Sequence, residues 1–150
     1  MNKVEKQDLY NEAFSFYEFA ECGRKHIPEK AFVERHIPYI VNMAFCTELY
    51  LKFLLVENGK PLSEIKKYSH NLYMMYNDLS QEQKDTIYSS FKRPLIYSID
   101  TELQKINSAF PEWRYLVLNK ANGDKKRFQF APYFIKELNE ILGSICEAML

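Results

Sequence analysis

The chain has 150 residues, 47% of them hydrophobic, which suits one packed globular domain over residues 1–150 and excludes a disordered segment. Its 20 basic and 20 acidic residues cancel, which argues against a generic polyanion-binding surface but leaves room for local charged patches.

The N-terminus and the cysteines indicate the compartment. The first residues are charged and lack the apolar core of a signal peptide. Cys22, Cys46 and Cys146 show no CxxC or metal-ligand spacing, so they are interpreted as reduced thiols of an intracellular protein. We therefore expect a cytoplasmic protein without a metal or cofactor.

Two helices are predicted near the N-terminus. Over residues 4–22 apolar side chains recur at helical spacing, and Gly23 offers a place for the helix to stop. Residues 26–36 form a polar connection. A second helix is predicted over residues 38–58, because proline suits its first turn and a glycine follows its end.

The second helix contains an apolar stretch, residues 37–56, that approaches membrane-spanning length. Asn42, Glu48 and Lys52 lie near the middle of this stretch. A charge at the centre of a membrane costs about 2.5–3.5 kcal/mol, so the core helix of a soluble protein is the better interpretation. We expect no membrane partner.

Shorter helices are predicted after a loop over residues 60–67. Ser80 and Gln83 have the spacing of a capping box, which opens a helix, and proline interrupts the pattern at Pro94 and Pro111. The predicted helices cover residues 70–79, 80–92, 99–110 and 132–148.

Residues 113–119 are rich in β-formers, Asn122 and Gly123 give a turn signal, and residues 127–130 alternate. We expect a short β-hairpin or extended excursion near residues 113–130. The predicted fold class is all-α: a bundle of four to six helices with this one excursion.

Three motifs, taken in order, resemble the HEPN superfamily. Residues 44–52 read A-x-x-x-E-L-x-L-K, residues 69–72 read SHNL at the opening of a short helix, and residues 110–115 read F-x-x-W-R-Y. The resemblance implies an HEPN-like all-α bundle that usually forms a homodimer. Many members are metal-independent ribonucleases of toxin–antitoxin or antiphage systems. Others partner with nucleotidyltransferases, or bind nucleotides or RNA without catalysis.

The ribonuclease branch of that superfamily carries an arginine followed, after four to six residues, by a histidine. None of His26, His36 and His70 follows an arginine at that spacing. The resemblance therefore indicates a member without the ribonuclease motif.

Glu48 and Lys52 are spaced to pair on one helix face. On a surface such a pair contributes only about 0.3–0.5 kcal/mol, too little to explain its place in a core helix. If buried, both charges need further partners, which we expect among His70, Asn71 and Arg114. This polar junction is interpreted first as a helix junction or dimer seam, and second as a pocket for a phosphate or base.

Arg114 has two interpretations. Its guanidinium could hold a phosphate in a bidentate contact while Trp113 and Tyr115 stack on a base. The favoured alternative is an ion pair with Glu48 or Glu112 that fastens the extended segment to the bundle.

Lys125, Lys126, Arg127 and Phe128 form a basic and aromatic arm that could contact nucleic acid. A solvated loop has the same composition, and we favour that interpretation.

The leading hypothesis is a non-catalytic HEPN-like module that binds RNA, a nucleotide or a partner protein as a homodimer. An atypical endoribonuclease is the enzymatic alternative, with Arg114 stabilising phosphate charge and His70 acting as acid or base. A third hypothesis is a regulatory subunit of a nucleotidyltransferase-type partner.

Overall fold

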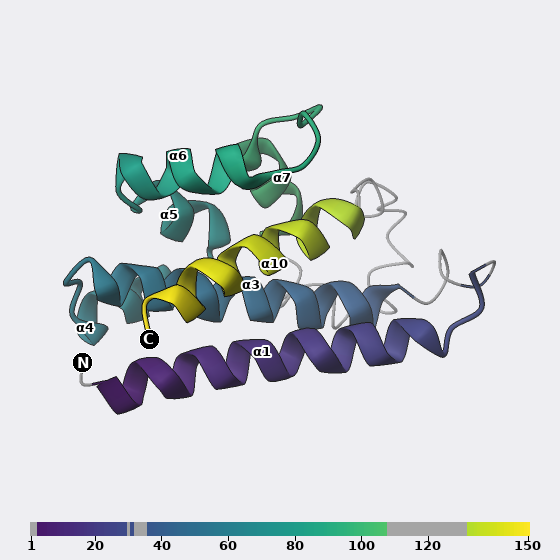
Figure 1. The fold of residues 1–150 in the computed structure, drawn as a ribbon, viewed down its shortest axis with the longest axis horizontal. Coiled ribbons are helices and arrows are strands. Elements are labelled where there is room, and N and C mark those ends of the chain that lie inside the picture. The colour runs from purple at the N-terminus through teal and green to yellow at the C-terminus, as the bar shows by residue number, and fades with distance from the viewer. Residues whose placement is uncertain (1–2, 30, 32–35, 108–131) are drawn as a thin grey trace.

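The computed structural model describes residues 3–29, 31, 36–107 and 132–150. Over these residues the chain is all-α, with no strand. Two long helices, α1 (Lys3–Lys25) and α3 (Ile37–Glu57), run antiparallel side by side, and α10 (Pro132–Ala148) packs along both (Figure 1). The shorter helices are α4 (Leu62–Ile65), α5 (Leu72–Asn77), α6 (Gln81–Ser90) and α7 (Ile99–Ile106), and a 3₁₀ turn covers Lys66–Tyr68.

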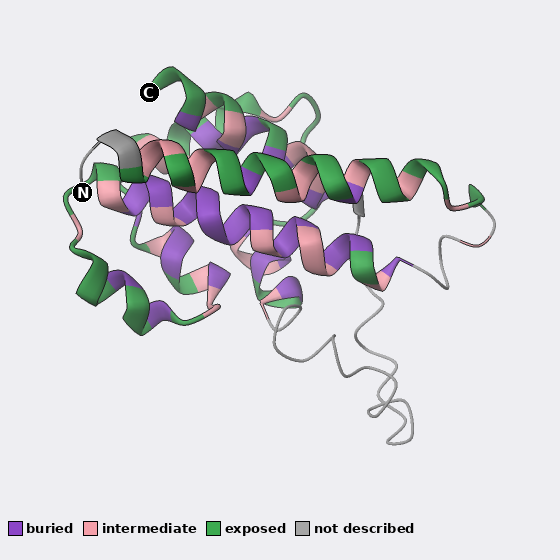
Figure 2. Ribbon diagram, turned by 90° about the horizontal axis from the view of Figure 1, so that it is seen from below, coloured by how far each residue is buried: buried purple, intermediate pink, exposed green. Residues whose placement is uncertain are grey.

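The centre of the bundle is α3. It is buried over most of its length because α1, α10 and α5 all pack against it (Figure 2). Within the described residues α3 is the one helix long and apolar enough to cross a membrane, and 72% of its apolar window is buried inside the fold. That burial fits the core helix of a soluble bundle.

The capping box at the start of α6 is confirmed. The Ser80 hydroxyl accepts a hydrogen bond from the backbone N–H of Gln83, and the Gln83 side chain accepts one from the backbone N–H of Ser80. Helix α6 ends at Ser90, two residues before the predicted Lys92.

Gly23 does not end α1, contrary to the sequence prediction. The helix continues to Lys25. The Arg24 guanidinium lies 5.3 Å from the ring centre of Tyr39 and 5.5 Å from that of Tyr133, so the last turn is held against α3 and α10.

The described residues contain seven α-helices, where the sequence predicted four to six. The additional helix is α4, in the predicted loop, where the buried side chain of Ile65 anchors a single turn against the core. Helix α5 begins at Leu72 rather than His70, because the Asn71 side chain accepts from the backbone N–H of Met74 and caps the helix. The excursion predicted near residues 113–130 lies outside the described residues.

A buried polar contact joins α3 to α10. The Thr47 hydroxyl lies 2.7 Å from Asn139 Oδ1, and Asn139 Nδ2 donates to the Met43 carbonyl oxygen at 2.9 Å. Thr47 is 0% exposed and Asn139 1% exposed. Because buried polar groups are costly when unpaired, these bonds select one register of α10 on α3.

Asn139→Leu should therefore lower the free energy of unfolding by about 1–3 kcal/mol, because it removes two buried hydrogen bonds and leaves an apolar side chain of the same branching in their place. Urea unfolding followed by circular dichroism measures the change. Ser144→Ala on the exposed face of the same helix is the control and should change stability by less than about 0.5 kcal/mol. Equal effects of the two substitutions would contradict this account.

Candidate functional site

Glu48 lies in the middle of α3 and is only 2% exposed. Its two carboxylate oxygens have different partners. Oε1 accepts from Lys52 Nζ at 2.6 Å, one turn along α3, and Oε2 lies 2.9 Å from His70 Nδ1. The Lys52 and His70 side chains are 25% and 37% exposed. Glu48, Lys52 and His70, which we call the Glu48 cluster, therefore connect a buried carboxylate to two side chains that reach the surface.

The backbone before α5 brings His70 to Glu48. Ser69 has a positive φ of 51°, and such a sparsely populated backbone conformation costs a non-glycine residue about 1–3 kcal/mol. The turn at Ser69 separates the 3₁₀ turn from α5, and the buried Leu72 fixes the start of that helix. Asn71 caps α5, so among the described residues the partners of the Glu48 carboxylate are Lys52 and His70.

The hydrogen-bond roles in the Glu48 cluster follow from the donor chemistry. A carboxylate only accepts hydrogen bonds, so His70 Nδ1 carries the hydrogen of the contact with Glu48. The carboxylate thus sets the orientation of both the imidazole and the ammonium group. Such an arrangement can bind an anion, or it can orient an imidazole for proton transfer.

Two groups of predicted site residues lie outside the described residues. They are Trp113, Arg114 and Tyr115 of the proposed polar junction, and Lys125, Lys126, Arg127 and Phe128 of the proposed nucleic-acid contact. Their roles stay predictions.

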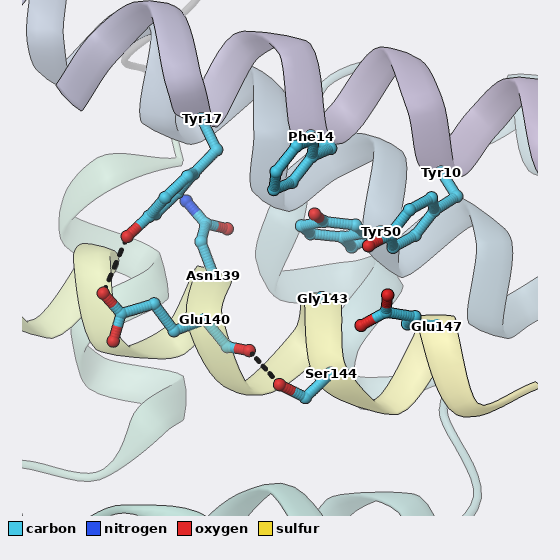
Figure 3. Close-up of a pocket in the computed structure, with 9 residues that line it drawn as sticks. All are labelled: Tyr10, Phe14, Tyr17, Tyr50, Asn139, Glu140, Gly143, Ser144 and Glu147. Carbon is cyan, nitrogen blue, oxygen red and sulfur yellow. Dashed lines mark hydrogen bonds between the residues drawn. The ribbon is translucent and has the colours of Figure 1, made fainter. Parts of the chain in front are cut away.

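A cavity that the sequence did not predict lies between α1, α3 and α10 (Figure 3). Tyr10, Phe14 and Tyr17 of α1 line it together with Tyr50 of α3. The helical spacing of the three aromatic residues on α1 was the only local sign of this cavity. It was not sufficient, because their partners on α10 lie more than a hundred residues away in the sequence. One example is the 2.7 Å hydrogen bond from Tyr17 Oη to Glu140 Oε1.

Burial keeps the phenols of this cavity protonated. It is the largest effect raising the pKa of Tyr10, Tyr17 and Tyr50, and the hydrogen bond to Glu140 raises that of Tyr17 further. The three hydroxyls are therefore neutral hydrogen-bond donors at physiological pH.

The buried thiols are poor nucleophiles. Burial raises the pKa of both Cys46 and Cys146 well above its ordinary value. Because the thiolate is the reactive form, neither side chain suits nucleophilic catalysis at neutral pH. The described residues also hold no group of three or more His, Cys, Asp or Glu side chains arranged to bind a metal ion.

Comparisons of the chain with known protein families, with curated proteins and with solved structures each found no match. The resemblance to the HEPN superfamily therefore depends on the three sequence motifs. Two of these motifs, in residues 44–52 and 69–72, meet at the contact between Glu48 and His70.

A double-mutant cycle tests the buried carboxylate. Glu48→Gln and Lys52→Met should show a coupling free energy of about 1–3 kcal/mol in urea unfolding, because Glu48 is removed from solvent. The matched control is the more exposed pair of Lys6 and Glu57, whose coupling should stay below about 1 kcal/mol. Coupling of Glu48 and Lys52 no larger than that of the control pair would contradict the account.

Proposed function

We propose that the chain is a non-catalytic HEPN-like binding module that recognises the phosphate of RNA or of a nucleotide, in the cytoplasm and as a homodimer. The supporting observation is the 2.9 Å contact between Glu48 Oε2 and His70 Nδ1, which joins two family-like motifs.

The Glu48 cluster is preorganised for binding an anion. Lysine and histidine side chains normally lose rotamer freedom when they bind an anion. In the Glu48 cluster the buried carboxylate already restrains both, and both remain partly exposed. A phosphate oxygen could then accept charge-assisted hydrogen bonds from Lys52 at a reduced entropic cost.

The direct test is titration of the purified protein with a single-stranded RNA oligonucleotide and with ATP, followed by calorimetry. We expect Lys52→Met to weaken binding about tenfold, since it removes a charge-assisted hydrogen bond to the phosphate. Lys105→Met is the control, because Lys105 pairs with the buried Glu102 in the same way but on α7. Gel filtration with light scattering should show a dimer. A monomer that binds neither ligand would overturn the proposal.

One observation favours a second candidate, an atypical endoribonuclease. The contact between Glu48 and His70 is the kind by which a carboxylate orients a catalytic imidazole. In this alternative Arg114, predicted from the sequence, would stabilise the charge on the phosphate.

Incubation with total RNA in the presence of a metal chelator separates the two candidates. The binding proposal predicts intact RNA. Cleavage that disappears in both His70→Gln and Arg114→Ala would replace the binding proposal with the enzyme.

A further inference from the structure

The cavity between α1, α3 and α10 is a separate feature from the Glu48 cluster. Its volume is about 210 Å³, and none of Glu48, Lys52 and His70 lines it. In Figure 3 the aromatic side chains of α1 point toward α10, and Gly143 lies opposite them. The cavity is smaller than the roughly 300–1,000 Å³ typical of sites for drug-sized ligands, so it suits a small group.

Aromatic rings form one side of the cavity. The rings of Tyr10 and Phe14 are nearly parallel with centres 6.1 Å apart, and the Tyr50 ring is tilted against that of Tyr10 at 6.0 Å. The faces of aromatic rings carry negative electrostatic potential and attract cations.

The α10 side of the cavity is acidic. Glu140 lies beside Tyr17 at one end, and Glu147 lies beside Tyr10 at the other (Figure 3). Glu140 accepts a hydrogen bond from the uncharged Tyr17 hydroxyl, and no ion pair within the described residues includes either glutamate. No described lysine, arginine or histidine lines the cavity, so its negative charge is uncompensated there.

The side chain of Tyr50 supplies a second indication of a ligand. Tyr50 is only 2% exposed, and its hydroxyl makes no hydrogen bond to the described residues although it lines the cavity. Gly143 makes room for this hydroxyl, because a Cβ at that position would lie 2.9 Å from Tyr50 Oη. A ligand N–H or O–H could donate to this oxygen and satisfy it.

From this arrangement we propose that the cavity binds a small organic cation with an alkylammonium headgroup. The headgroup would lie against Tyr10, Phe14 and Tyr50, with its charge balanced by Glu140 and Glu147. The same chemistry could come from a free amine or from a lysine side chain of a partner protein, and the experiment includes both.

The experiment is an NMR titration of the full chain with choline, with butylamine and with a blocked lysine derivative. We expect saturable shifts centred on the Gly143 amide. The uncharged analogue of choline, with carbon in place of the quaternary nitrogen, should bind at least about tenfold more weakly, because cation–π attraction and charge balance are lost.

The double substitution Glu140→Gln and Glu147→Gln should weaken cation binding about three- to tenfold, and both positions are exposed enough for the fold to tolerate it. Glu64→Gln with Glu82→Gln is the control, since it removes the same charge from other exposed sites and should leave binding unchanged.

Tighter binding of choline or butylamine than of the lysine derivative would assign the cavity to a free amine. Equal or tighter binding of the lysine derivative would assign it to a partner's side chain. Three results would overturn the proposal: no saturable shift with any cation, equal binding of the uncharged analogue, or unchanged binding in the Glu140 and Glu147 double variant.

Discussion

Glu48 introduces a negative charge into the packed middle of α3, and the surrounding structure has to stabilise it. Removing one partner of a buried ion pair typically costs about 3–5 kcal/mol, a large part of the total stability of a small domain. Lys52 lies on the same helix as Glu48, but His70 belongs to a separate segment that must fold back against α3. The contact with His70 therefore constrains how the chain leaves α3 and where α5 begins.

The connection from α3 to α5 is built to satisfy that constraint. Gly59 has a φ of 84°, which lets the chain turn sharply after α3. Farther along, Tyr68 donates to Asp78, and Lys60 Nζ donates to Tyr68 Oη at 2.8 Å. The Tyr68 hydrogen bond is the main cause that lowers the pKa of Asp78, and Lys60 adds to it. This contribution to stability is thus complete above the ordinary pKa of aspartate and is lost as the pH falls through the lowered value.

Local signals predicted the long elements of the fold and missed the contacts between distant helices. The capping box at Ser80 could be predicted because its two partners lie three residues apart. The position of Glu48 and Lys52 in an apolar helix indicated that these charges, if buried, need further partners. By contrast, α1 continues past Gly23 because Arg24 packs against α3 and α10. Both helices lie farther along the chain, so the sequence around Gly23 does not reveal these contacts. The bond between Thr47 and Asn139 spans 92 residues, and the cavity at Tyr50 also depends on the packing of α10.

The Glu48 carboxylate accepts a hydrogen bond from His70 and so holds two separate motifs together. Long-range ¹H–¹⁵N NMR of the histidine rings measures which ring nitrogen carries hydrogen. We expect Nδ1 of His70 to be protonated in the wild-type protein at neutral pH, and its signals to change in Glu48→Gln more than in Glu102→Gln. A wild-type His70 ring with no hydrogen on Nδ1 would contradict the account.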